Sequence, residues 1–252
     1  MSDVKTDSKG AVVVTGAAQG IGYAIAERFA ALGQRVVIAD LRGSEVAAQK
    51  LGHGALGFDV NVGNAAQVDA MMAFAAENCG GVSVLVNNAG IYTSLTKMPF
   101  EEIDPEEWKQ VFNVNVEGVW FCCRAAARYM KPAGNGNIVN IGSAVVSKGT
   151  AGFLHYVASK AAVVAMTRTL ARELGPFGVR VNTVSPGLTQ SDGVLAGGAA
   201  REKQSADIRL QRLVQRDIAP DDIAGAVLYL AGPDAGMLTG QNLTVDGGIT
   251  MN

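Results

Sequence analysis

Short apolar runs alternate along the chain with longer stretches in which apolar residues recur every three or four positions. The short runs are rich in Val and Ile and are bounded by Gly, Asp or Asn, which is typical of strands buried on both faces of a parallel sheet. About seven strands are predicted, at residues 11–15, 35–40, 54–60, 82–87, 136–142, 178–184 and 241–246.

The longer stretches carry the helical period of about 3.6 residues. Helices are predicted from the glycine-rich turn at 16–22 to residue 32, and at 65–77, 105–130, 158–170 and 220–230. Where strand and helix alternate throughout, right-handed crossovers make the strands parallel and place helices on both faces. The predicted fold is α/β, with one doubly wound, Rossmann-like parallel sheet.

No linker, internal repeat or low-complexity tract interrupts the chain of 252 residues. One α/β domain commonly reaches about 250 residues, so a single domain over 1–252 is expected. Residues 188–200 are rich in Gly, Ala and Ser without a strong period, which indicates a mobile lid over about 188–215. An ordinary surface insertion is the alternative.

Composition narrows the classes of function. Apolar residues make up 48% of the chain and charged residues 17%, which favours a large core and argues against intrinsic disorder. The net charge of -2 provides no basic surface for nucleic acid or for an anionic membrane. Because no uncharged apolar run of about 18 residues occurs, a cytoplasmic location is expected.

The three cysteines, Cys79, Cys122 and Cys123, have no zinc-type spacing and no histidine close to them in sequence. No metal site is predicted. Adjacent residues on a helix point about 100° apart, so Cys122 and Cys123 are poor disulfide partners. Buried, reduced thiols are expected.

A nucleotide site is indicated where the first strand ends. That strand is followed by Gly16-Ala-Ala-Gln-Gly20-Ile-Gly22 and then by a helical pattern. Glycines let the backbone turn tightly and approach a pyrophosphate, whose charge is bound by the free N–H groups at the start of the helix. The alternative is an ordinary strand-to-helix turn, which also favours glycine.

An acid at the end of the second strand bears on the choice of nucleotide. Asp40 lies about as many residues after Gly16 as the acid that binds the ribose does in dinucleotide-binding folds. Its carboxylate can accept hydrogen bonds from the ribose hydroxyls. A 2′-phosphate in the same place would meet a like charge, so NAD is favoured over NADP. Arg42 is the opposing signal, because an arginine just past this strand can accommodate that phosphate.

Catalytic chemistry is indicated by Tyr156-Val-Ala-Ser-Lys160. On a helix this spacing puts the phenol and the ammonium on one face. A nearby cation favours the phenolate and lowers a phenol pKa that is ordinarily about 10, so Tyr156 is a candidate general acid and base. A surface Tyr/Lys pair is the alternative, since such pairs are common on helices.

Further polar residues follow predicted strands or interrupt a predicted helix. In chain order the sequence contains Thr15-Gly16-x-x-x-Gly20-x-Gly22, Asp59-Val60, Asn87-Asn88-Ala89-Gly90, Asn115, Ser143, Tyr156-x-x-x-Lys160 and Pro186-Gly187. With these motifs in this order over about residues 10–250, the chain resembles the short-chain dehydrogenases/reductases. The resemblance implies one domain that both binds a dinucleotide and performs catalysis.

The resemblance also implies roles for individual residues. Tyr156 would be the acid and base, Lys160 would lower its pKa and bind the nicotinamide ribose, Ser143 would hold the substrate oxygen, and Asn115 would support a water-linked proton relay. Family members often have Val or Ile in place of Thr189. The cofactor-binding set expected on this basis is Gly16, Gln19, Gly20, Ile21, Gly22, Asp40, Leu41, Asp59, Val60, Asn87, Ala89, Gly90, Tyr156, Lys160, Pro186, Gly187 and Thr189.

Three functions are compatible with these motifs. The first is an NAD-dependent secondary alcohol dehydrogenase or ketone reductase. The second is a 3-oxoacyl-carrier-protein reductase, which needs a basic docking face such as Arg124 and Arg128 or Arg168 and Arg172 could form. The third is a regulator that senses NAD without turnover, although such a protein has no need of the complete Ser/Tyr/Lys/Asn set.

The substrate is expected to be an uncharged, hydrophobic alcohol or ketone. Residues 144–146 and 152–154 bring apolar side chains toward Tyr156, and the lid adds others with almost no cation. Lys97, Lys148 and Arg201 are the cations that would enter the site if the substrate were charged. The family resemblance further suggests a homotetramer in which the helices around 105–130 and 155–174 pair across a two-fold axis.

Overall fold

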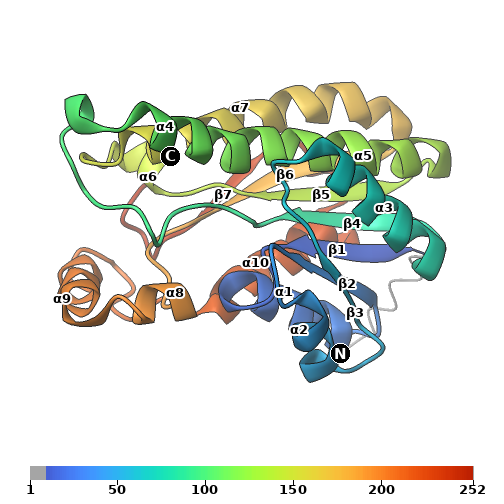
Figure 1. The fold of residues 1–252 in the computed structure, drawn as a ribbon, viewed down its shortest axis with the longest axis horizontal. Helices are drawn as coiled ribbons and strands as arrows, with labels where there is room; N and C mark the ends of the chain where they lie inside the picture. The colour runs from blue at the N-terminus through green and yellow to red at the C-terminus, as the bar shows by residue number, and fades with distance from the viewer. Residues whose placement is uncertain (1–9, 252) are drawn as a thin grey trace.

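A seven-stranded sheet, parallel throughout, runs through the protein in the computed structural model, which describes residues 10–251 apart from the side chains of 199–201 (Figure 1). The strand order is β3-β2-β1-β4-β5-β6-β7, and every neighbouring pair is parallel. The predicted doubly wound sheet is confirmed. Its strands are β1 Ala11–Thr15, β2 Arg35–Asp40, β3 Leu56–Asp59, β4 Val82–Asn87, β5 Gly136–Ile141, β6 Val179–Pro186 and β7 Asn242–Val245.

Helices cover both faces of the sheet, and none of those described has the length and apolar content needed to cross a membrane. Short 3-10 turns lie at Phe100–Glu102, Gly175–Phe177 and Pro233–Ala235. The α-helices are α1 Gly20–Ala31, α2 Ser44–Leu51, α3 Ala65–Cys79, α4 Pro105–Phe112, α5 Gly118–Ala133, α6 Val145–Lys148, α7 Leu154–Leu174, α8 Asp192–Leu195, α9 Gly198–Arg209 and α10 Pro220–Ala231.

The core consists of two layers because successive strand side chains point to opposite faces. Val13 and Val37 pack with α3, α5 and α7 on one face, whereas Val12 and Val36 pack with α1, α2 and α10 on the other. Figure 1 shows these two groups of helices above and below the sheet. All three cysteines are buried and unpaired, as expected.

The helix predicted at 105–130 is interrupted. Asp104 caps its start by accepting a hydrogen bond from the backbone N–H of Glu106 at 2.9 Å, and Pro105 occupies the first helical position. At Asn113–Glu117 the backbone widens into a π-helical turn before α5 continues to Ala133. Turns of this kind are frequently found at functional sites, and this one contains Asn115.

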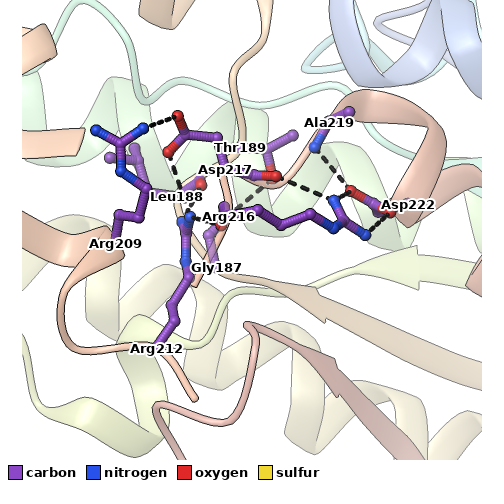
Figure 2. Close-up of polar contacts among 9 residues, drawn as sticks. All are labelled: Gly187, Leu188, Thr189, Arg209, Arg212, Arg216, Asp217, Ala219 and Asp222. Atoms are coloured by element: carbon purple, nitrogen blue, oxygen red, sulfur yellow. Dashed lines mark hydrogen bonds and ion pairs between the residues drawn. The ribbon is translucent and has the colours of Figure 1, made fainter. Parts of the chain in front are cut away.

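The segment expected to be a mobile lid contains two helices, α8 and α9, beyond the carboxyl edge of the sheet (Figure 1). Neither helix was predicted, because residues 188–200 show no strong period. Whether the segment moves is still a prediction. Its far end is fixed by polar contacts, which are drawn in Figure 2.

Arg212 is the centre of those contacts. Its side chain is 1% exposed, and it donates to the backbone carbonyls of Leu188 and Arg216 at 2.7 Å each. The carboxylate of Asp217 lies 3.5 Å away and also pairs with Arg209 at 3.0 Å. Arg212 therefore ties the end of the lid to the loop that follows β6, where the predicted nicotinamide contacts begin.

We predict that Arg212→Met lowers the free energy of unfolding by about 2–3 kcal/mol, because two carbonyls and one carboxylate lose a buried charged donor. Arg209→Met is the matched control, since Arg209 shares Asp217 but is 43% exposed at its side chain. Its effect should stay below about 1 kcal/mol. Denaturant unfolding measures both, and equal losses would show that Arg212 is not the anchor.

Candidate active site

Tyr156 and Lys160 lie on α7 one turn apart, facing the carboxyl edge of the sheet. Both are buried, with 7% and 5% of their surfaces exposed. The Lys160 ammonium donates to the carbonyl of Ile141, at the end of β5, at 2.7 Å and lies 5.9 Å from the centroid of the Tyr156 ring. The catalytic reading is therefore favoured over a surface pair, because neither group faces open solvent.

The Tyr156 phenol and the Lys160 ammonium both have shifted pKa values. Burial raises the pKa of Tyr156, a hydrogen bond with Ser143 opposes part of the rise, and neighbouring Tyr92 adds to it. Burial also lowers the pKa of Lys160 to about 8. Desolvation thus opposes the charged form of both groups, and the lowering of the phenol pKa by Lys160 stays a prediction.

Ser143 reaches Tyr156 from the loop after β5. This loop is held to the end of β6 by the hydrogen bond from the Ala144 N–H to the Pro186 carbonyl at 2.9 Å. Ser143 is buried, and its hydroxyl is the polar group that partly offsets the desolvation of Tyr156. The Ser143 hydroxyl and the Tyr156 phenol, which are 13 residues apart in the sequence, thus lie next to each other in the structure.

Asn115 lies in the π-helical turn and is fully buried. Its carbonyl oxygen accepts from the Ile91 N–H at 2.8 Å, and its amide donates to the Ile91 carbonyl at 3.2 Å and to the Ser159 hydroxyl at 3.1 Å. Ser159 in turn donates to the carbonyl of Tyr156 at 2.7 Å. Asn115 thus joins the loop after β4 to α7, and the sequence analysis missed Ser159, which completes this link.

The glycine-rich turn after β1 packs against the loop after β4. Gly16 has a φ of 63°, and a Cβ there would lie 2.7 Å from the Cα of Ala89, so only glycine fits. The Asn88 amide donates to the carbonyls of Thr15 at 2.9 Å and Gly16 at 2.8 Å. Asn88 belongs to the Asn87-Asn88-Ala89-Gly90 motif, but no role was predicted for it. Its position beside Asn87 is the signal that could have indicated one.

The start of α1 has no capping side chain of its own. Gln19 occupies the cap position without a side-chain hydrogen bond, and the N–H of Gly20 instead donates to the carboxylate of Asp192 at 2.8 Å. Asp192 opens α8, so the lid contacts the glycine-rich turn directly. An anion is thus already accepted at this helix end, as the dipole and the free N–H groups favour.

Asp40 is fixed beside the same turn. One carboxylate oxygen accepts from the Ala18 N–H at 2.9 Å, and the other accepts from the Leu41 N–H at 2.7 Å. Each oxygen retains capacity for a second hydrogen bond. Leu41 and Arg42 are exposed on the loop that follows. The arrangement fits the predicted contact between Asp40 and ribose hydroxyls.

Three other expected cofactor contacts have structural partners of their own. The Asp59 carboxylate accepts from the Ser44 N–H at 2.9 Å, and these hydrogen bonds at the start of α2 lower its pKa. The Val60 N–H donates to the carbonyl of Asp40 at 2.6 Å. Asn87 is buried, and its amide donates to Asn140 at 2.8 Å, so its side chain is used inside the sheet.

The loop after β6 forms another wall of the site. The Gly187 N–H donates to the Val245 carbonyl at 2.9 Å, and the buried Thr189 hydroxyl donates to the carbonyl of Gly187 at 3.1 Å. Thr189 also pairs with Ile218 in an isolated bridge. This loop is therefore fixed between β7 and the segment before α10.

A cavity of about 700 Å³ brings much of the predicted set together. Tyr92, for which no role was predicted, adds an aromatic wall, with its ring centroid 4.9 Å from that of Tyr156 and 6.0 Å from that of Phe153. The size is typical of small-molecule sites. The predicted site residues that line the cavity are Ile21, Gly90, Ser143, Tyr156, Lys160, Pro186, Gly187 and Thr189.

The outer part of the cavity differs from the expected uncharged pocket. Ala144, Val145 and Phe153 line it as predicted, but so do Lys97 and Lys148. The expectation that the pocket has nothing to neutralise an anion is therefore wrong. Lys203, which the sequence analysis did not consider, joins them from α9, whereas the side chain of Arg201 lies outside the described residues.

Known proteins share this fold and much of this sequence. D-threitol dehydrogenase of Mycolicibacterium smegmatis is 38% identical over 256 residues, covering 99% of this chain and 95% of that protein. Two solved structures from Brucella melitensis align with a TM-score of 0.88 and 33% identity. One is a short-chain glucose/ribitol dehydrogenase (97% of this chain, 98% of that one), and the other is a 3-ketoacyl-(acyl-carrier-protein) reductase complexed with NADH (96% and 98%).

A family profile described as enoyl-(acyl carrier protein) reductase matches residues 16–250, from the glycine-rich turn to the segment after β7. The match therefore includes every element that lines the cavity. Together with the sheet order and the placement of Ser143, Tyr156 and Lys160, these similarities show that the chain belongs to the short-chain dehydrogenase/reductase family of oxidoreductases, which use a nicotinamide cofactor.

Proposed function

We propose that the protein transfers a hydride between NAD(H) and a secondary alcohol or ketone, with Tyr156 as the acid and base. The observation that carries this proposal is the cavity in which Ser143, Tyr156 and Lys160 lie together beside the loop after β6. A hydroxyl, a phenol and an ammonium at the inner end of one cavity can hold a carbonyl oxygen and exchange a proton with it.

The residues at the carboxyl edge fit a dinucleotide. Gly16 leaves room for a close backbone approach, α1 presents its amino end, and Asp40 is fixed at the end of β2. The nicotinamide group, when bound, supplies the hydride chemistry. The carboxylate of Asp40 favours NAD, because it would repel a 2′-phosphate by about 4 kcal/mol at ~4 Å and an effective dielectric of about 20.

The protein's own residues would handle the proton. Ser143 would orient the substrate oxygen, and Tyr156 would donate a proton to it or accept one from it. Lys160 would bind the nicotinamide ribose and stabilise the phenolate once the site is filled. Asn115 lies behind the cavity, so its role in a proton relay would run through water and the Ile91 carbonyl that it contacts.

A 3-oxoacyl-carrier-protein reductase is the second candidate, because one solved structure with that activity in its name has the same fold. The arginines considered for docking differ in availability. Arg124 and Arg128 both pair with Asp69, whereas Arg168 and Arg172 line a hollow beside β7. A regulator without turnover is less favoured, since it would not need the grouped catalytic residues.

We also keep the homotetramer as a proposal. Trp120 on α5 is half exposed, and Phe177 after α7 is 44% exposed. Aromatic side chains of this size would be buried favourably against a second copy.

Replacement of Tyr156 by Phe tests the central role. Turnover should fall by at least about 100-fold because only the proton-transfer group is lost. Affinity for NADH, measured by fluorescence titration, should change by less than about twofold. Tyr229→Phe, on the exposed side of α10, is the control and should retain full activity. Substantial turnover by the Tyr156 variant would remove it as acid and base.

Lys160→Met should abolish activity yet stabilise the protein at neutral pH by about 1–3 kcal/mol, because the buried ammonium carries a desolvation cost. The pKa of Lys160 is about 8 in the folded protein and 10.5 ordinarily, so the unfolded chain binds more protons between these values. Native stability should therefore rise relative to the variant as pH increases from about 8 to about 10.5.

Urea unfolding from pH 7 to 10.5 measures this difference, with Lys50→Met at an exposed position of α2 as the control. The free energy of unfolding of the control, relative to the native protein, should not change over this pH range. A variant less stable than the native protein at every pH would contradict the assigned cost of the buried charge.

Asp40→Ser should relax the preference for NAD by about tenfold or more in the ratio of kcat/KM values for NAD and NADP, since the repulsive carboxylate is removed. Glu45→Gln, an exposed acid at the start of α2, should leave the ratio nearly unchanged. If the native protein already prefers NADP at equal concentrations, Arg42 rather than Asp40 determines the cofactor.

A further inference from the structure

Three lysines from three separate elements line the outer part of the cavity. Lys97 lies in the loop after β4, Lys148 ends α6, and Lys203 is on α9. All three side chains are exposed, whereas Tyr156 and Lys160 at the inner end are buried. We propose that these three lysines bind an anionic group, a carboxylate or a phosphate, on the far end of the substrate; this inference rests on the proposed function.

Lys148 is held in place without being neutralised. Its ammonium donates to the amide oxygen of Gln211 at 2.8 Å, and the amide nitrogen of Gln211 donates to the Asp207 carbonyl at 3.3 Å. The second contact fixes which end of the amide faces the lysine. Because an amide oxygen carries no net charge, the ammonium keeps its full charge and two donors for another ligand.

Lys97 is positioned by the loop that leads to Tyr156. Its stem lies against Gly152, where an added Cβ would be 2.9 Å from the Lys97 Cγ. The backbone beside it is fixed by the hydrogen bond from the Met98 N–H to the Gly152 carbonyl at 3.1 Å. A side chain at position 152 would displace Lys97, so the glycine keeps this cation close to the catalytic loop.

The charge at the mouth of the cavity is positive. None of the ion pairs among the described residues includes Lys97, Lys148 or Lys203. Two acids line the same cavity, Asp207 and Asp246. Asp207 is exposed one helical turn after Lys203, whereas the buried carboxylate of Asp246 accepts from the N–H groups of residues 248–250.

This local charge contrasts with the chain as a whole, whose net charge is -2. Three ammonium groups against one exposed carboxylate raise the local concentration of anionic substrates and favour their binding. The cluster is therefore a feature of the cavity and does not follow from a generally basic surface.

The inner wall determines where the anion must be on the substrate. Tyr92, Val145, Phe153, Leu188 and Val194 surround the approach to Tyr156 with apolar surface. Lys160 is the cation beside Tyr156, and it is assigned to the nicotinamide ribose. A charge next to the reacting carbon would therefore be desolvated without a cation of its own, which is costly. The favoured substrate thus has an apolar body, a secondary alcohol or ketone at one end and an anionic group several bonds away.

The test compares matched substrates with the complete enzyme and saturating NADH. A ring ketone with a carboxylate opposite the carbonyl should have a kcat/KM about tenfold or more above that of its methyl ester, and added salt should reduce this ratio. A keto phosphate ester of similar length distinguishes phosphate from carboxylate, and the better of the two identifies the anion. Equal values for acid, phosphate and ester would overturn the proposal.

Variants assign the preference to the lysines. Each change of Lys97, Lys148 or Lys203 to Met should lower kcat/KM for the anionic substrate by about two- to fivefold, and the triple variant should remove the preference while leaving the ester unchanged. Lys131→Met is the control, since Lys131 stacks on Phe177 at 4.6 Å, near the amino end of β5. An intact preference in the triple variant would overturn the proposal.

The failure of the proposed function would look different, because no ketone, charged or neutral, would then be reduced. Binding of the keto acid to the Tyr156→Phe variant in the presence of NADH, measured by calorimetry, tests the lysines without turnover. Weaker binding of the acid after removal of the three lysines would support the anion site. Binding that does not depend on them would overturn it.

Discussion

The contact between the ends of β1 and β4 is the constraint on which both halves of the site depend. The chain winds in opposite directions from these two strands, so a crevice opens between them at the carboxyl edge. Hydrogen bonds from Asn88 to Thr15 and Gly16 close the base of that crevice, and the Thr15 hydroxyl accepts from the N–H groups of Asn88 and Ala89 at 3.1 Å. The same contacts thus hold both the glycine-rich turn and the loop after β4 in place.

A second chain of buried polar contacts orients α7 on the sheet. The Asn140 amide donates to the Thr167 hydroxyl at 2.8 Å, Thr183 donates to the same hydroxyl at 2.8 Å, and Thr167 donates to the carbonyl of Val163. Every group in such a network must find a partner, which restricts α7 to one rotation and one height. The face with Tyr156 and Lys160 is thereby directed at the end of β5 before any ligand is present.

The sequence predicted the strands, the sheet class and the inner end of the cavity because those depend on local patterns. A buried parallel strand is a run of β-branched residues, and a catalytic Tyr/Lys pair has a fixed helical spacing. Contacts between segments that are distant in the sequence could not be predicted in this way. Gly20 and Asp192 lie 172 residues apart, and nothing in either neighbourhood signals their hydrogen bond. Lys203 was missed for the same reason, since only the placement of α9 brings it to the cavity.

The π-helical turn at Asn113–Glu117 has a consequence for how this protein can change. A π turn carries one residue more than the α-helical turn it replaces, and here that extra residue makes room for Asn115 to bond with Ile91 and Ser159. Loss of a single residue would produce a more regular helix and would also break the link to α7. A more regular helix here would therefore be incompatible with the position of Asn115 in the site, so we expect deletions in this segment to be selected against.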